Sequence, residues 1–410
     1  KILDDGQSGP EFHEVVDLTS RFSTISISQS LADSFMTMTI GISDATQILE
    51  RLGSKGLQSE EFVKIKLYSP GRDPVDLLFH VAGITPVISD DHQKTMFYNL
   101  VCTTKEKLIN DVSNINKFFS ATAADCAQSI WENGLLNHPK YKMLKTTKGI
   151  AWEDREDFIV PGLQISSAMD WLSKKAYGGP DYPGSLYYFF ENNLGFHFCN
   201  IETYIEINKG SGRKFTYQPQ QSAVSPQSID QIQSIQRLGG LTLPSTSERI
   251  NSGTYSHTVR TLDLTDKKHN DTFFNLDEKF DTFKNPGNVF NTSNKFFNEI
   301  AKDTFFEYLT TKDSTSKDSN IERIAGTREA YRDLLNSYQV TIMVYGDTEL
   351  NVGDVIELDL TEAGSSGDRN LSLYSGSWLV QSLNHVCDNE KFNTTLTLSK
   401  GGLNHEQTKT

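Results

Sequence analysis

The feature that most constrains the fold of this chain is a pattern of three alternating segments that occurs near both ends. Near the N-terminus, apolar and polar side chains alternate in residues 62–67, 75–88 and 95–103, and polar turns separate these segments. In the first segment Lys64 and Lys66 occupy one face and apolar residues occupy the other. Period-two alternation broken by polar turns is typical of an antiparallel sheet with one buried face.

The same order recurs near the C-terminus, in residues 355–360, 377–386 and 392–399. Here Glu357 and Asp359 alternate with apolar residues in the first segment, as the two lysines do near the N-terminus. A chain that builds the same small β-unit twice is predicted to be a scaffold with internal pseudo-symmetry. Such a design argues against an enzyme that is organised around a single cleft.

The chain of 410 residues is long enough for roughly two to three domains. The sequence predicts an α+β, mainly β fold with two similar antiparallel β-barrel domains and mixed α/β inserts. The first barrel is predicted in 11–106, and a mixed helical and hairpin insert in 107–210. The second barrel is predicted to be discontinuous, in 211–262 with 338–400, and a loop-rich and helical insert covers 263–337.

Helical spacing of apolar residues predicts elements inside the inserts. A helix is predicted over 121–135, with Thr122 as its N-cap, and a longer one over 321–337. A short helix with an isoleucine stripe is predicted over 225–240, and residues 265–320 are predicted to be largely irregular.

The charge balance argues against a chain that grips the phosphates of nucleic acid. The chain has 39 Lys and Arg against 53 Asp and Glu, which gives a formal net charge of -14. Phosphate binding requires an excess of positive side chains on one face. Solubility alone also accounts for this balance, and a surface that nucleic acid slides past remains open.

The sequence predicts no catalytic residue, no cofactor and no metal ion. The acidic run 153–157 is typical of a solvated face or a salt-bridged interface. His385 and Cys387 lack a third catalytic partner, and we interpret them as an edge histidine and a core cysteine. The four cysteines are far apart and form no CxxC, which argues against zinc and predicts reduced, buried thiols.

A characteristic order of elements follows Arg328. It consists of a helix, a strand, a Gly-Asp step, a second strand and a closing hairpin, in residues 328–335, 340–344, 346–347, 350–356, 376–385 and 394–398. This order resembles the end of the central baseplate hub proteins of contractile-tailed bacteriophages. Late-control-D-type hub proteins and the N-terminal half of type VI secretion spike proteins share it. Residues 187–198 and 253–263 resemble the same family.

The resemblance implies two tube-type β-barrels per chain and a homotrimer. Three chains then form a six-fold-like ring that adapts a three-fold central spike to the six-fold tail tube and surrounds part of the DNA channel. The implied partners are a central spike protein, with or without a lysozyme domain, the tail-tube protein, baseplate wedge proteins and the tape-measure protein. The implied location is the tail baseplate of a virion, assembled in the host bacterial cytoplasm without a membrane anchor.

The resemblance also implies that the hub chain is not itself an enzyme. We expect much of the acidic excess to line the lumen, so that DNA passes without specific binding. Lys64, Lys66, Glu357 and Asp359 are candidates for exposed, lumen or interface positions of equivalent strands. The alternatives are a type VI secretion-like spike body, a tail-tube initiator, a cell-wall hydrolase and a carbohydrate-binding receptor protein of the tail.

Overall fold

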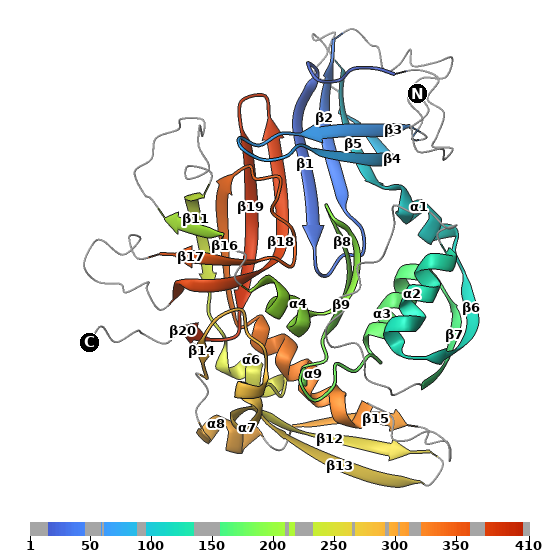
Figure 1. Ribbon diagram of the computed structural model, residues 1–410, viewed down its shortest axis with the longest axis vertical. Coiled ribbons are helices and arrows are strands. Elements are labelled where there is room, and N and C mark those ends of the chain that lie inside the picture. The colour runs from blue at the N-terminus through green and yellow to red at the C-terminus, as the bar shows by residue number, and fades with distance from the viewer. Residues whose placement is uncertain are drawn as a thin grey trace.

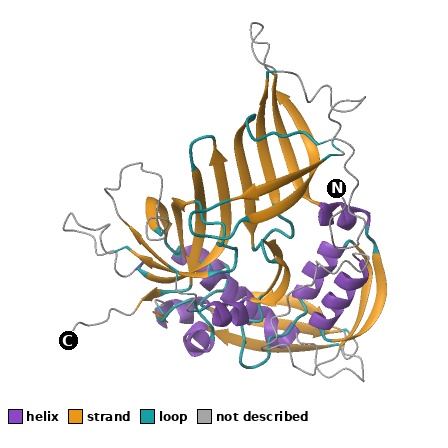
Figure 2. Cartoon of the chain, turned by 45° about the horizontal axis from the view of Figure 1, so that its top comes forward, coloured by secondary structure: helices purple, strands orange, loops and turns teal. Residues whose placement is uncertain are grey.

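The computed structural model describes most of the chain. The described residues are 15–45, 59, 61–87, 96–134, 156–209, 213–217, 233–264, 267–291, 295–301, 304–310, 321–360 and 374–404. Within them the protein is mainly β. In Figure 2 the helices lie below the large fan of strands at the top of the view. No helix in this part of the chain is both long and apolar enough to cross a membrane.

One long sheet organises the molecule (Figure 1). Its strands are β1 (Phe22–Ser30), β2 (Thr37–Asp44), β3 (Phe62–Leu67), β4 (Val75–Val87), β5 (Met96–Thr104), β10 (Lys214–Tyr217), β11 (Ser234–Thr242), β16 (Tyr338–Tyr345), β17 (Val355–Asp359), β18 (Gly376–Asp388) and β19 (Phe392–Lys400). Their order is β17-β10-β11-β16-β19-β18-β1-β2-β5-β4-β3, and β17 also pairs with β18.

The additional β17–β18 pairing closes six strands, β10, β11, β16, β17, β18 and β19, into a barrel. Alternation of side chains along each strand directs one set inward. The barrel is therefore filled by buried apolar residues, among them Phe215, Ile342, Leu358, Trp378 and Leu396, each at most 1% exposed. A mainly β architecture with a barrel, as predicted from the sequence, is confirmed.

The N-terminal strands continue the same sheet beyond the barrel. They follow β18 in the order β1-β2-β5-β4-β3, and within the described residues no pairing between β1 and β3 closes them. Met38, Ile40, Phe79, Leu100 and Cys102 are buried on one side of these strands and form a core of their own. The predicted limits of a first barrel, 11–106, remain a prediction.

The first insert combines helices with two hairpins. It contains α1 (Lys105–Val112), β6 (Ile115–Ala121), α2 (Ala123–Gly134), β7 (Glu156–Leu163), α3 (Ile165–Ser173), β8 (Tyr187–Asn192), β9 (Gly195–Asn200) and α4 (Ile201–Asn208). The helix predicted over 121–135 is confirmed as α2. The Thr122 hydroxyl accepts a hydrogen bond from the backbone N–H of Asp125 at 3.2 Å, as an N-cap does. Trp131 of α2 packs against Phe189 and Phe196 of the β8–β9 hairpin.

The second insert is more regular than its composition indicates. It contains α6 (Thr246–Asn251), β12 (Ser256–Asp263), β13 (Lys268–Asn275), α7 (Leu276–Lys279), β14 (Val289–Phe290), α8 (Lys295–Ile300), β15 (Phe305–Thr310) and α9 (Ile321–Leu335), and β14 pairs with β20 (Leu403–Asn404). The prediction of largely irregular structure in 265–320 is therefore wrong for its described residues. Strand β12 pairs with β13 and β15 in a separate sheet, not in the barrel.

The short helix predicted over 225–240 is also wrong for the described residues 233–240. These residues belong to β11, which pairs with β16. Residues 225–232 lie outside the described residues. Gly239 is needed for close approach to the neighbouring strand, because a Cβ there would lie 2.8 Å from the carbonyl oxygen of Thr341. Gly239 and Gly240 thus lie at an irregularity in the pairing of β11 with β16. They do not end a helix.

Arg328 of α9 ties the two inserts together. Its guanidinium is buried and donates hydrogen bonds to the carbonyl oxygens of Ser185 (2.8 Å), Ala176 (2.5 Å) and Lys174. Two of these carbonyls lie at the C-terminal end of α3, where unpaired carbonyl groups favour a cation. Burial lowers the pKa of the guanidinium to about 10.

Candidate assembly surface

The three-segment pattern of the sequence is a repeat in the structure as well. Strands β3-β4-β5 pair in the same way as β17-β18-β19. Both middle strands have 13 residues, and both third strands have nine. Each middle strand has one bulged residue, Ala82 in β4 and Gln381 in β18. In both strands the bulge lies two residues after the last residue that pairs with the first strand, His80 in β4 and Leu379 in β18.

The correspondence extends to two further strands on each side. The first pair of β1 with β2 is Phe22↔Ile42, and the first pair of β11 with β16 is Ile235↔Val344. One residue is bulged directly after this pair in both cases. Strands β3-β4-β5-β2-β1 therefore form repeat 1, and strands β17-β18-β19-β16-β11 form repeat 2, with the same strand order. Their registers match except for a second bulge in β11, between Leu238 and Leu241, that β1 lacks.

The two repeats are joined edge to edge by antiparallel pairing of β1 with β18, which we call the internal seam. It runs from Thr24↔Asp388 to Ser30↔Ser382. Side chains reinforce it, because the Asn384 side-chain oxygen accepts hydrogen bonds from the hydroxyls of Ser26 (2.8 Å) and Ser28 (3.3 Å).

Charged side chains tie the repeats together beside the internal seam. Arg72, in the turn after β3, lies 3.2 Å from an oxygen of Asp347 and 2.8 Å from one of Glu349. Asp347 is fully buried, and both carboxylates follow β16 of repeat 2. The hydroxyl of Ser69 donates to the carbonyl oxygen of Gly346 at 2.8 Å. Partly buried ion pairs of this kind are screened less by salt than exposed pairs.

The tip of the β8–β9 hairpin supports the internal seam from the first insert. Asn193 accepts a hydrogen bond from Gln29 of repeat 1 at 2.8 Å and donates to the carbonyl oxygen of Thr348 at 3.2 Å. Its neighbour Glu191 accepts hydrogen bonds from the N–H of Met36 and the hydroxyl of Thr104, each at 2.9 Å. The insert is thereby bonded to both repeats.

Glu191 makes this contact dependent on pH. Burial raises the pKa of its carboxyl from 4.5 to about 8, with a smaller contribution from the nearby Glu106. A carboxyl with a raised pKa in the folded state stabilises the fold below its unfolded pKa, and this contribution is lost as the pH rises through the folded pKa. We expect the melting temperature of the protein to fall between pH 5 and pH 9.

Glu191→Gln tests this expectation, because the amide keeps an acceptor oxygen for Met36 and Thr104 but does not ionise. The variant should melt at a higher temperature than the unmodified protein at pH 9, and the difference should shrink at pH 5. Part of the pH dependence should remain, since burial also raises the pKa of Glu202 to about 8. Thermal unfolding at several pH values is the measurement, with Glu390→Gln in an exposed turn as the control. Parallel profiles for Glu191→Gln and the unmodified protein would contradict it.

The sheet presents one face on which hydroxyl and amide side chains predominate, which we call the polar face. It lies opposite the buried sides of β1, β2, β4, β5, β16, β18 and β19. Its hydroxyl and amide side chains are Thr24, Ser26, Ser28, Thr37, Thr39, Thr85, Asn99, Gln339, Thr341, Ser382, Asn384, Thr395 and Thr397. The exceptions on this side include Asp76 at the start of β4, Asp388 at the end of β18, Arg237 on the adjacent strand β11 and the exposed apolar Val101 of β5.

The four residues singled out in the sequence lie on the outermost strands of the two repeats, β3 and β17. Lys64 and Lys66 of β3 hold the same positions in repeat 1 as Glu357 and Asp359 of β17 hold in repeat 2. Asp359 is half-buried and the other three are exposed. Lys64 lies 3.8 Å from Asp76, and Asp359 lies 3.0 Å from Lys214. None of the hydroxyl and amide side chains that define the polar face lies on β3 or β17, and a lumen or interface role for these four residues stays a prediction.

Sequence reasoning missed the polar face, although a signal for it exists. Serine and threonine alternate with apolar residues in 23–30, 37–43 and 393–399. Alternation with hydroxyls in place of charges indicates an exposed sheet face of unusual neutrality.

The interpretation of His385 and Cys387 is wrong in its assignment of burial. His385 is 2% exposed, and its Nδ1 lies 2.8 Å from the hydroxyl of Thr394, whereas Cys387 is only half-buried. Burial lowers the pKa of His385 to about 4. The reason is the seam: β1 covers this part of β18, so that a histidine at the edge of one barrel becomes internal to the long sheet. The other three cysteines are buried, and all four are free.

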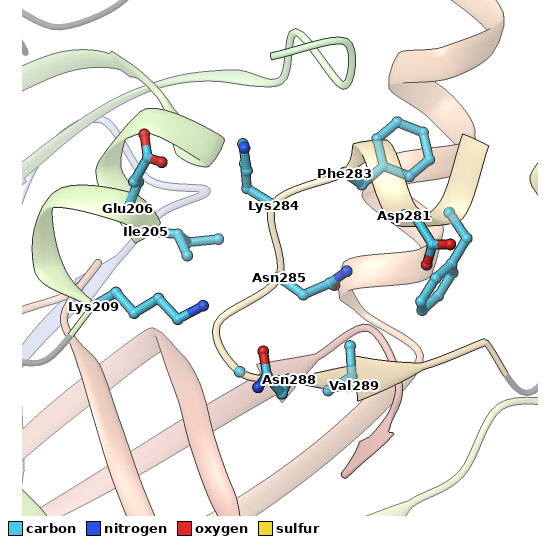
Figure 3. A pocket seen from close by; sticks show the side chains of 11 residues that line it. Ile205, Glu206, Lys209, Asp281, Phe283, Lys284, Asn285, Asn288 and Val289 are labelled. Atoms are coloured by element: carbon cyan, nitrogen blue, oxygen red, sulfur yellow. The ribbon is translucent and has the colours of Figure 1, made fainter. Parts of the chain in front are cut away.

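No constellation for catalysis or metal binding emerges from the described residues. Within them no three His, Cys, Asp or Glu side chains lie close enough to hold a metal ion. Most of the acidic run 153–157 lies outside the described residues. An open pocket of about 270 Å³ lies between α4 and the segment 280–289, and Figure 3 shows Lys209 extending from α4 toward this segment. Its charges are mixed, with Glu206 already accepting from the Tyr182 hydroxyl at 2.7 Å.

Comparison with known proteins finds the same fold in two solved tail proteins. No family model and no curated protein sequence matches the chain. Among solved structures it is similar to the 43 kDa tail protein of prophage MuSo2 from Shewanella oneidensis, with a TM-score of 0.52 and 10% identity, over 92% of this chain and 93% of that one. It is also similar to the tail protein from Neisseria meningitidis MC58, with a TM-score of 0.50 and 10% identity, over 92% of each chain.

This chain has the fold of these tail proteins. The match covers nearly the whole of both chains, so it includes the two repeats and the inserts together. At 10% identity the likeness concerns the fold and not individual side chains.

Proposed function

We propose that the chain is the structural baseplate hub of a phage-type contractile tail. In this proposal three chains form a ring that adapts a three-fold central spike to the six-fold tail tube. The observation that carries the proposal is the pair of register-matched repeats joined side by side in one chain. Two equivalent units per chain let three chains present six docking positions. The fold shared with two tail proteins supports a place in a tail.

We further propose that the polar face lines the DNA channel of this ring. Hydroxyl and amide side chains of both repeats gather on this face, so this proposal has a lumen wall of low charge, whereas the sequence predicts an acidic one. Affinity for DNA comes mainly from cations that neutralise phosphates and release counterions. A face of hydroxyls and amides offers DNA few such contacts, and DNA is expected to pass without binding.

The proposed partners follow from the same role. They are a central spike protein on one side of the ring, the tail-tube protein and tape-measure protein on the other, and baseplate wedge proteins around it. The inserts, most of whose elements lie below the N-terminal strands in Figure 1, are the proposed contacts with spike and baseplate. Assembly is proposed in the host bacterial cytoplasm, and the chain is proposed to have no enzymatic activity.

The mass of the assembly tests the proposal. Native mass spectrometry is expected to give three times the chain mass of 46.1 kDa. A hexamer would favour a tail-tube initiator in place of the hub. A chain that stays monomeric, both alone and with a spike partner, would contradict ring assembly and with it the proposed function.

A further inference from the structure

We infer that two copies of this chain associate by pairing the free edge of β4 in one copy with the free edge of β11 in the next. The internal seam serves as the template for this contact. Because β1 corresponds to β11 and β18 corresponds to β4, exchanging each strand of the seam for its counterpart yields a β11–β4 seam. The inference rests on the proposed function for the closure of the ring, and the edges themselves come from the strand pairing.

The edge of β4 is open where the edge of β18 is covered. On the side of β18 away from β19, β17 pairs with residues 376–379 and β1 pairs with 382–388. On the corresponding side of β4, β3 pairs with residues 75–80. Residues 82–87 pair on this side with no strand in the described part of the chain. They occupy the positions that β1 covers in repeat 2.

The edge of β11 is open in the corresponding way. On the side of β1 away from β2, residues 24–30 pair with β18. On that side of β11, β10 pairs with Ser234 and Ile235 only, and residues 237–242 pair there with no described strand. Arg237 and Thr242 are accordingly exposed, and Leu243, which follows the strand, is 53% exposed.

Unpaired strand edges with open N–H and C=O groups are templates for pairing with another chain. The two edges lie at opposite sides of the long sheet (Figure 1). They therefore cannot pair within one copy, and a contact between unlike edges is head-to-tail. Head-to-tail contacts close into a ring or continue as a filament, depending on the rotation between copies. The occupant that fits both edges at once is a second copy of this chain.

The register of the new seam follows from the internal one. Ser28 lies opposite Asn384 in the internal seam, and their counterparts are Thr242 and Thr85. The N–H of Leu31 donates to the carbonyl oxygen of Gln381 at 2.9 Å. Hydrogen-bonded and non-hydrogen-bonded pairs alternate along an antiparallel ladder. Since Leu31 and Gln381 form a hydrogen-bonded pair, Ser28 and Asn384, three positions along, form a non-hydrogen-bonded pair, whose Cα atoms lie about 4.5 Å apart. This separation is within the range that a disulfide bridges.

Two features set the new seam apart from its template. Strand β11 has a second bulge between Leu238 and Leu241 that β1 lacks, so its ladder is interrupted there. Pro86 holds the position of His385 and has no backbone N–H, so the seam between copies has one hydrogen bond fewer than the internal seam. Proline is tolerated at a sheet edge for the same reason. A weaker ladder of this kind is expected to form between copies and to leave the isolated chain soluble.

Disulfide capture tests the inferred pair. Thr85→Cys and Thr242→Cys are combined in one chain that also carries Cys387→Ser, which removes the half-buried native thiol. After mild oxidation, denaturing gels without reductant are expected to shift the main band from one chain mass to three. Each single-cysteine variant alone should stay at one chain mass, and a mixture of the two should give covalent dimers.

Thr39→Cys combined with Thr242→Cys is the matched control. Thr39 is an exposed threonine of the same face, but β1 and β5 already occupy both sides of its strand. No crosslink between copies is expected from it. Ser28→Cys with Asn384→Cys should form a disulfide within one chain and so verify the geometry of the template.

Amide hydrogen exchange of the unmodified protein gives a second measurement. Exchange in residues 237–242 should slow when the copies assemble. A trimer by native mass spectrometry without the Thr85–Thr242 crosslink, or without this protection, would overturn the inferred seam and leave the proposed function standing. A monomer under all conditions would overturn both.

Discussion

Replacing Arg328 with methionine should lower the free energy of unfolding by about 3–5 kcal/mol. The buried guanidinium donates to three carbonyl oxygens, those of Lys174, Ala176 and Ser185. Methionine has a similar length but no donor, so the three carbonyls would lose their partner inside the protein. A buried acceptor without a partner costs about 1–3 kcal/mol. Denaturant titration followed by circular dichroism gives the measured difference.

Arg332→Met on the same helix is the matched control. Arg332 is 47% exposed and pairs with Glu329 and Asp333 at the surface. Exposed ion pairs contribute about 0–1 kcal/mol, so this variant should be nearly as stable as the unmodified protein. Similar losses for the two variants would show that Arg328 is not the link between α3 and α9 that its hydrogen bonds indicate.

Introducing lysine at Thr39 and Thr341 should turn the assembled protein into a DNA-binding ring. The two threonines hold corresponding positions in the two repeats, on the proposed channel wall. In a trimer the double substitution would add positive charge at six places around the channel. Non-specific binding with a dissociation constant on the order of 10⁻⁴–10⁻⁶ M is expected, with affinity that falls as salt rises. Fluorescence anisotropy of labelled duplex DNA at two salt concentrations measures both effects.

Thr272→Lys with Thr282→Lys adds the same charge to exposed threonines of the second insert, away from the polar face. This control should bind DNA much more weakly than the Thr39/Thr341 variant, and the unmodified protein should not bind detectably. Equal binding by the two lysine variants would mean that net charge alone decides, and the polar face would lose its assignment as the channel wall.

The strands that carry the repeat were predictable because each has a local signal. The segment 62–67 coincides with β3, and 75–88, 377–386 and 392–399 differ from β4, β18 and β19 by one or two residues at their ends. Alternation directs side chains to two faces whatever the strand pairs with. The cap at Thr122 is similarly local, because its partner lies three residues away.

The errors arose where long-range pairing overrides local spacing. Ile229, Ile232 and Ile235 have helical spacing, yet Ile235 lies in β11 because β16 offers it a ladder. His385 is buried because a strand more than 350 residues away in sequence covers it, since Ile27 is its partner. No property of residues near 385 specifies that partner.

The sequence by itself therefore determined that the chain builds one β-unit twice and which side chains share a face. Only the tertiary structure decided that the units are joined through β1 and β18, which strands close the barrel, and which edges stay open. The physical reason is that side-chain alternation is a property of one strand. Backbone hydrogen bonds have the same chemistry for every residue except proline, so the choice of partner strand depends on packing between distant segments.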